Sequence, residues 1–308
     1  MKFFVAGALA ALAFDGCSQN VSSPSLADAS SVTGAAVPNT SLGQMLIALD
    51  RDSGRLEYWP LGAGGSQAQW LSRSLHISDP TGMVANGDIV YIASYSPPAI
   101  VSYDVDTKKT KTLSDPYGAP LDIAIDRSAD LYALHAGNVT VFPSRAQAYE
   151  LTCPYVTAST AIAVDDEANV FVSGTGPGSF SGVVEYATGS STCAKLAIKT
   201  KASVTGLGVN PRNDALIVVD NVDCDGGLGG RVMVYRRPFG SKVLHRGNLH
   251  ARCPGSFRLD ATARYILFPD GRPEWNVSQR EFPGISYPRK YTSGTPSGFT
   301  TIPNNLPN

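Results

Sequence analysis

The sequence contains few charged residues, and the two signs nearly cancel. Charged side chains make up 17% of the 308 residues, with a formal net charge of −1, whereas an ordinary soluble domain has roughly 25% charged residues. Such a composition provides no basic surface for nucleic acid or for an anionic membrane, so neither partner is expected. No stretch keeps a helical period of apolar residues without interruption by glycine, proline or β-branched residues, so a bundle of long helices is not expected either.

Familiar catalytic motifs are missing as well. A nucleophile elbow of the form G-x-S-x-G does not occur, and the glycine-rich segment 226–230 is not followed by the Lys-Ser/Thr of a phosphate-binding loop. No two cysteines have the C-x-x-C spacing that is typical of a zinc site. The sequence therefore leaves open whether the protein is an enzyme, and no motif predicts a cofactor.

Turn-forming residues, in contrast, are plentiful. The chain has 30 glycines and 21 prolines, which favours many short strands joined by turns. After residue 43 one unit recurs: a short apolar strand, a turn containing Asp or Asn, and a second apolar strand. Anchored on Met83, Ile123, Ile162, Leu207 and Phe257, the units follow one another at steps of 40, 39, 45 and 50 residues. Repeats of this length are typical of radial or stacked repeat folds.

A third strand that ends in an aromatic residue follows the first two in each unit. The six copies end at Tyr58, Tyr103, Phe142, Tyr186, Tyr235 and Tyr287, the last in segment 285–287. One aromatic at the same place in every unit is expected to pack between neighbouring units rather than to bind a ligand. A weaker fourth strand follows most copies.

The two ends of the repeat region complement each other. The region begins with a second strand at residues 45–49, and it ends with a first strand at residues 297–302. Placed side by side, the two ends complete a sixth unit, and this closure leaves no open sheet edge between the first and last units. The sequence therefore predicts an all-β fold over residues 43–308, a six-bladed β-propeller of four-stranded blades, expected as a monomer.

The clearest copy of the unit, residues 161–172, reads apolar-Ala-apolar-Asp, a short polar turn, and Asn-apolar-aromatic-apolar. This pattern resembles the NHL-repeat propellers, and the whole domain is similar more broadly to six-bladed propellers of the gluconolactonase and regucalcin type. The resemblance implies the scaffold more than an activity, because one fold hosts unrelated functions.

The N-terminal segment has the features of an export signal. A run of 12 apolar residues, 3–14, follows a lysine, and it is too short to span a bilayer but fits the core of a signal peptide. The Gly-Cys pair that ends at Cys17 resembles a bacterial lipobox, in which the cysteine is acylated after cleavage. The alternative is an ordinary secretory signal that is cut near Ala11 or Ala13.

Residues 1–17 are therefore predicted as the signal and residues 18–42 as a disordered tether. The tether is rich in small and polar residues, which cannot bury enough surface to offset the entropy of ordering. The predicted location is outside the cytoplasm. The protein would be either a lipoprotein of the bacterial envelope, attached to the membrane only through its lipid, or a secreted or periplasmic protein.

Four cysteines lie in the repeat region, at Cys153, Cys193, Cys224 and Cys253. An even number behind an export signal suggests disulfides, with three possible connectivities. Cys224 and Cys253 fall in loops that share one face of a propeller, so this pair is favoured. Cys153 and Cys193 are then left for each other, although the strand order assigns them to opposite faces.

Polar residues follow several of the second strands. Asp50, His135, Asp220 and Asp270 hold these positions, with serines at the two remaining blades. Loops after the second strands meet at the mouth of the central channel, so these side chains could hold a divalent cation that polarises an ester carbonyl or activates water. The alternative is that they cap turns at the strand ends. Lactonase-type enzymes use a Glu, an Asn and an Asp around a metal, and no Glu opens the first repeat here.

One loop is densely acidic. Asp220, Asp223 and Asp225 precede a Gly-Gly pair and are further candidates for a metal site. The loop lacks the twelve-residue frame and the closing glutamate of a calcium loop, so a glycine-rich surface turn is the alternative.

Two functions from different classes remain. The first is a binding or scaffold module of the cell envelope, with an unknown protein, glycan or small molecule as its partner. The second is a metal-dependent hydrolase or lactonase that uses the channel mouth.

Overall fold

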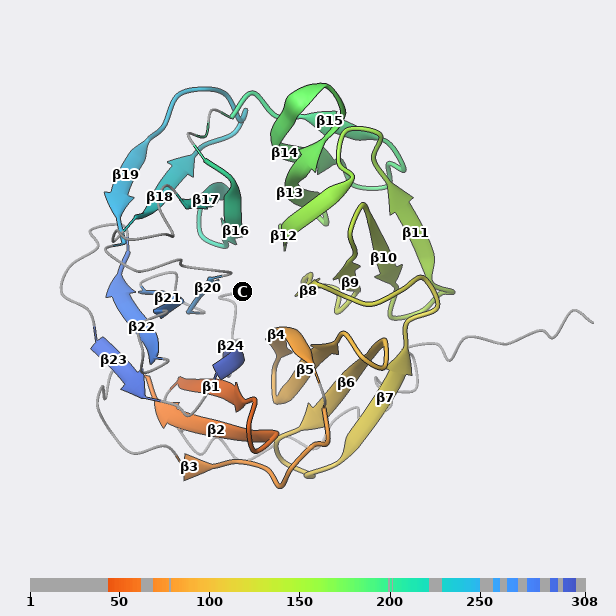
Figure 1. The fold of residues 1–308 in the computed structure, drawn as a ribbon, viewed down its shortest axis with the longest axis vertical. Coiled ribbons are helices and arrows are strands. Elements are labelled where there is room, and N and C mark those ends of the chain that lie inside the picture. Colours follow the sequence, from red (N-terminus) through yellow and green to blue (C-terminus); the bar gives the residue numbers. More distant parts are fainter. Residues whose placement is uncertain are drawn as a thin grey trace, which may run out of the picture.

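The computed structural model describes residues 44–61, 69–77, 79–198, 200, 202–221, 229–249, 257–260, 265–270, 276–282, 289–292 and 296–302. The described chain forms six four-stranded antiparallel sheets, which stand as blades around a central axis (Figure 1). The predicted all-β, six-bladed propeller is therefore confirmed. Within the described ranges, no helix is long and apolar enough to span a membrane.

Each blade is described from its innermost to its outermost strand. Blade 1 contains β24 (Pro296–Ile302), β1 (Met45–Asp50), β2 (Arg55–Pro60) and β3 (Gln69–Trp70). Blade 2 contains β4 (Pro80–Asn86), β5 (Ile89–Ser94), β6 (Ala99–Asp104) and β7 (Thr110–Ser114). Blade 3 contains β8 (Asp122–Ile125), β9 (Leu131–Leu134), β10 (Asn138–Phe142) and β11 (Tyr149–Thr152).

The other three blades follow the same order. Blade 4 contains β12 (Ala158–Val164), β13 (Val170–Gly176), β14 (Phe180–Tyr186) and β15 (Cys193–Lys195), with a short 3-10 turn at Pro177–Ser179. Blade 5 contains β16 (Val204–Asn210), β17 (Ala215–Asn221), β18 (Gly230–Tyr235) and β19 (His245–Asn248). Blade 6 contains β20 (Arg258–Leu259), β21 (Tyr265–Asp270), β22 (Asn276–Glu281) and β23 (Arg289–Thr292).

The ring closes as the two ends of the repeat predict. β24 pairs antiparallel with β1, with Ala48 opposite Phe299 and Leu46 opposite Thr301. The C-terminal strand therefore lies innermost in blade 1, close to the axis (Figure 1). Both ends of the repeat region thus belong to one sheet, which removes the open edge that two separate terminal blades would have.

The hydrophobic core lies between neighbouring blades. One cluster joins blades 3 and 4 and contains Tyr132, Leu151, Val170 and Tyr186, and comparable clusters join the other neighbouring blades. Four of the third-strand aromatics are at most 4% exposed, namely Tyr103, Phe142, Tyr186 and Tyr235. Their predicted packing between blades is confirmed.

Two of the third-strand predictions need correction. In blade 1 the buried aromatic is Trp59, with Tyr58 only partly buried. Trp59 lies opposite Leu46 of β1, which is fully buried. In blade 6 the third strand is Asn276–Glu281, and segment 285–287 lies outside the described residues. This strand packs through Val277, which is fully buried, and it does not end in an aromatic.

The two ends of the ring differ in their connections. The tight turns between first and second strands lie at one end, which we call the turn face. The loops after the second strands and the links between blades lie at the other end, which we call the loop face.

Candidate functional site

The Asp and Asn residues that recur at the ends of the inner strands stabilise the turns that follow them. Asp126 accepts a hydrogen bond from the N–H of Asp130 at 2.9 Å and one from the hydroxyl of Tyr132 at 3.0 Å. Asp165 accepts a hydrogen bond from the N–H of Asn169 at 2.7 Å. Asp side chains commonly form such local bonds in turns. The repeated carboxylates of the turn face therefore have a structural role.

One arginine crosses the central channel. Arg258 lies on β20 of blade 6, and its guanidinium reaches Met83 of blade 2 and Asp122 of blade 3. Its Nε donates to the carbonyl oxygen of Met83 at 3.0 Å, and its Nη2 donates to Oδ1 of Asp122 at 2.8 Å. The side chains of Arg258 and Asp122 are 15% and 4% exposed. The channel is thus bridged by an ion pair that is largely removed from solvent.

Small residues in the other blades leave room for this arginine. Arg258 stands two residues before Asp260, the polar residue at the end of its inner strand. The corresponding positions of the other inner strands hold Val84, Ala124, Ala163, Gly208 and Thr300. A second long side chain at this level would compete with the guanidinium for the same space. One ion pair therefore replaces apolar packing at the centre of the ring.

A cavity of about 170 Å³ lies at the turn-face end of the channel. The inner strands form its walls, Arg258 contributes to its lining, and Asp126, Asp165 and Asp166 lie at its edge. Burial raises the pKa of Asp126. Burial also raises the pKa of Asp166, an effect that the charge of Arg127 opposes. The cavity is small, and its edge holds carboxylates together with Arg127.

Two of the predicted channel-mouth residues form contacts within their own blades. Oδ2 of Asp50 accepts a hydrogen bond from the hydroxyl of Ser53 at 2.6 Å, in the turn that follows β1. Asp220 is fully buried and forms a two-point ion pair with Arg231, whose Nε lies 2.8 Å from Oδ1. Asp270 ends β21, but its side chain lies outside the described residues.

The fourth predicted residue, His135, belongs to a buried polar cluster. Its Nε2 lies 2.8 Å from Oγ1 of Thr140 and 3.3 Å from Oδ2 of Asp115, and its Nδ1 lies 3.2 Å from the carbonyl oxygen of Ala119. Burial lowers the pKa of His135, but the hydrogen bond and charge of Asp115 outweigh burial and raise it above its usual value. The cluster fastens the link between blades 2 and 3 to blade 3.

Each of these three described side chains is therefore engaged by its own neighbours. Among the described residues, no group of three or more His, Cys, Asp or Glu side chains is arranged to hold a metal ion. The other predicted site residues, Asp223, Asp225, Cys17, Cys224 and Cys253, lie outside the described residues. Their roles, and the metal-dependent alternative, stay predictions.

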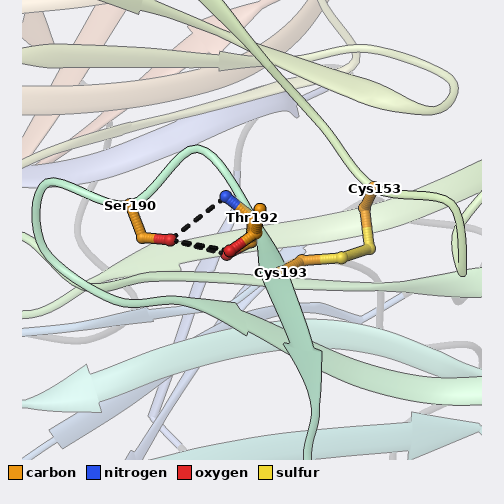
Figure 2. The surroundings of a disulfide bond; sticks show 4 residues. All are labelled: Cys153, Ser190, Thr192 and Cys193. Carbon is orange, nitrogen blue, oxygen red and sulfur yellow. Dashed lines mark hydrogen bonds between the residues drawn. A yellow bond between two sulfur atoms is a disulfide. The ribbon is translucent and has the colours of Figure 1, made fainter.

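A disulfide joins Cys153 to Cys193, with 5.6 Å between the Cα atoms (Figure 2). Cys153 follows β11 of blade 3, and Cys193 begins β15 of blade 4. The strand order does place these cysteines at opposite ends of their outer strands, since Cys153 follows the end of β11 and Cys193 begins β15. The twist of the blades brings these two ends together. The outer strands run along the rim (Figure 1), so the end of one meets the start of the next. The pairing itself is confirmed.

The turn before Cys193 is held by its own hydrogen bonds. The hydroxyl of Ser190 accepts a hydrogen bond from the N–H of Thr192 at 3.1 Å (Figure 2). This arrangement places the first residue of β15 beside the neighbouring blade.

Exposed tyrosines gather on the connections of the loop face. Tyr95 follows β5, Tyr117 lies in the link between blades 2 and 3, and Tyr155 lies in the link between blades 3 and 4. Their exposed fractions are 47%, 43% and 37%. Three of the six large apolar or aromatic side chains that are exposed in the described chain are thus found on consecutive blades of one face.

The comparisons with known proteins support the fold. No protein-family model matches the chain, and no curated protein matches it in sequence. Among solved structures, it is similar to a chain of the nidogen/laminin complex, with a TM-score of 0.66 and 16% identity over 84% of this chain and 98% of that one. It is also similar to TolB from Acinetobacter baumannii, with a TM-score of 0.62 and 13% identity over 84% of this chain and 66% of that one.

At this level of identity the similarity establishes a propeller and no narrower family. The resemblance to NHL-repeat and gluconolactonase-type propellers stays a prediction. The Arg258–Asp122 pair was missed by sequence reasoning, although a signal was present. In the unit that begins at Phe257, an arginine stands where the clearest copy has Ala163.

Proposed function

We propose that this protein is an exported propeller that binds another protein through its loop face. The observation that carries the proposal is the set of exposed tyrosines Tyr95, Tyr117 and Tyr155 on three successive connections of that face. Tyrosine combines a large apolar surface with a hydroxyl that can hydrogen-bond, and it is enriched in protein interfaces.

The central channel supports the same conclusion, because it offers little room for a ligand. Arg258 and Asp122 bridge its lumen, and the cavity beside them is about 170 Å³, below the roughly 300–1,000 Å³ of common ligand pockets. A surface that is built from loops therefore offers more binding area than the channel does. The nidogen chain with the same fold was solved in a complex with laminin, which fits a propeller that engages a protein.

Export is supported by the disulfide. Cys153–Cys193 links two neighbouring blades, and disulfides persist mainly in oxidising compartments outside the cytoplasm. An exported protein with a signal at residues 1–17 would form this bond during folding. A lipid on Cys17 would hold the propeller at the membrane, with the segment 18–42 as its tether.

The loop face can be tested with a photo-crosslinking amino acid in the cells that make the protein. The crosslinker is placed in turn at Tyr95, Tyr117 and Tyr155, and the control position is Leu244, which is 48% exposed in the connection between the third and fourth strands of blade 5, at the turn face. We expect one and the same crosslinked protein from the three tyrosine positions and not from the control. The same product from all four positions, or none from the tyrosine positions, would contradict the proposal.

A further inference from the structure

A second cavity lies away from both the channel and the loop face. It is a groove between blades 3 and 4, with a volume of about 330 Å³. This volume falls at the lower end of the roughly 300–1,000 Å³ of small-molecule sites. The groove is therefore large enough for a compact ligand.

Strand register explains why the groove is lined with tyrosines. Tyr132 and Tyr149 both lie opposite Val141 in blade 3, so their side chains share one face of that sheet. Tyr186 lies opposite Val170 in blade 4. All three tyrosines line the groove, and they come from the two sheets whose facing surfaces form the core of this blade pair.

The three hydroxyl groups are in different situations. The hydroxyl of Tyr132 donates to Oδ2 of Asp126. Tyr186 is only 2% exposed, yet its hydroxyl forms no hydrogen bond with the part of the chain that the structure describes. The hydroxyl oxygen of Tyr186 is not fully buried, so it is open to water or to a ligand in the groove. Tyr149 is 49% exposed, so one side of its ring faces the open part of the groove.

The remaining polar groups of the groove are hydroxyls and one carboxylate. Thr188, Ser190 and Ser191 lie in the turn between β14 and β15, and Asp130 is the one charged residue in the lining. Burial raises the pKa of Tyr149, assisted by the charges of Asp130 and Asp126. Burial, assisted by Glu150, raises the pKa of Tyr186 to about 12. Both phenols are therefore protonated hydrogen-bond donors at neutral pH.

We infer that this groove binds a pyranose ring of a neutral or amino sugar. A pyranose has an apolar C–H face, which can stack on the exposed ring of Tyr149, and a rim of hydroxyls, which can bond to Tyr186, Asp130 and the serines. A purely apolar ligand would leave the Tyr186 hydroxyl without a partner in the groove, and sites with such groups reject ligands that cannot bond to them. An anionic sugar would meet the negative charge of Asp130.

The inference can be tested by saturation-transfer NMR on the exported form of the protein. The probes are glucosamine, N-acetylglucosamine and glucuronate at millimolar concentration. We expect transfer to the first two sugars and much weaker transfer to glucuronate. No transfer to any probe, or equal transfer to glucuronate, would overturn the inference.

Variants locate the site. Tyr149→Ala should weaken sugar binding about fivefold to tenfold by removing the stacking surface. Tyr186→Phe should weaken it about threefold to tenfold, as expected for one hydrogen bond, and it should leave the unfolding midpoint unchanged because the lost hydroxyl bonds to no described residue. The matched control is Trp70→Ala, since Trp70 is an aromatic that is 52% exposed and lies on β3 of blade 1. Binding that is unaffected by both groove variants would overturn the inference.

A further probe separates two sources of the sugar. The linear tetramer of N-acetylglucosamine should bind more tightly than the monomer if the groove takes part of a polymer. Equal affinity would identify a free monosaccharide as the ligand, still in the same groove. Because the groove and the tyrosines of the loop face do not share residues, a failed crosslinking result leaves the sugar site standing, and the reverse holds as well.

Discussion

The two ends of the ring use polar residues in different ways. On the turn face the same solution recurs in several blades: an Asp at the end of the inner strand binds the turn that follows, as Asp126 and Asp165 do. On the loop face the polar contacts differ from blade to blade, and examples are the Asp220–Arg231 ion pair and the His135–Asp115 pair.

The difference shows how a repeat should be interpreted. A polar residue that returns with the period of the blade is explained by the local structure of the blade. A polar residue that breaks the period needs a partner of its own, which lies in the same blade for Asp220 and across the ring for Arg258. When a polar residue occurs in only one blade of a propeller, its interaction partner should therefore be identified first.

The Arg258–Asp122 pair offers the strongest test of this comparison. Arg258→Ala leaves a buried carboxylate without its cation, which typically costs about 3–5 kcal/mol of unfolding free energy. Urea unfolding should show the loss, and Asp122→Asn in the same background should recover part of it. The control is Arg51→Ala, because Arg51 and its partner Asp79 are 57% and 43% exposed and such pairs contribute at most about 1 kcal/mol. Equal effects of the two arginine variants would show that the channel pair has no special role.

A smaller effect is expected for the repeated carboxylates of the turn face. Asp126→Ala removes the acceptor for the Asp130 N–H and the Tyr132 hydroxyl, so we expect a loss of about 1–3 kcal/mol of unfolding free energy. Its neighbour in the next blade, Asp166, is exposed, and Asp166→Ala should change stability by less than about 0.5 kcal/mol. Urea unfolding of the two variants side by side measures the difference. If Asp166→Ala destabilises as much, the structural role assigned to the repeated position is wrong.

The fold could be predicted from the sequence because burial repeats with the blade. Each blade gives its inner strand, such as Leu207–Val209, and its third-strand aromatic, such as Tyr235, nearly the same surroundings. The pattern of these residues can therefore be recognised in the sequence alone. The prediction failed where one blade departs from the pattern. Blade 6 has Arg280 opposite Ile266, where the other blades place an aromatic, as blade 5 places Tyr235 opposite Leu216. The search for an aromatic led to Tyr287 instead.

The candidate sites were less predictable because they depend on contacts between distant segments. Arg258 and Asp122 are 136 residues apart, and only the closed ring brings them together. The groove between blades 3 and 4 depends on strand register, which places Tyr132 and Tyr149 opposite the same residue. The Cys153–Cys193 pair depends on the twist of the blades, which a flat drawing of the strand order does not include.

The buried histidine of the loop face gives a test that depends on pH. The pKa of His135 is raised in the folded protein, so its charged form stabilises the fold. This stabilisation is fully present below the unfolded pKa, about 6.5, and it is lost as the pH rises through the folded pKa.

The difference in unfolding free energy between wild type and His135→Gln should therefore shrink as the pH is raised from about 6 towards 9. Asp115 and Glu150 are the carboxylates whose charges act on the imidazole. Asp115 also accepts a hydrogen bond from the N–H of Tyr117 at 3.1 Å. Hydrogen exchange in the link that carries Tyr117 should thus accelerate, beyond the intrinsic effect of pH, over the same range. A difference between the two proteins that does not change with pH would show that the charge of His135 does not hold the loop face together.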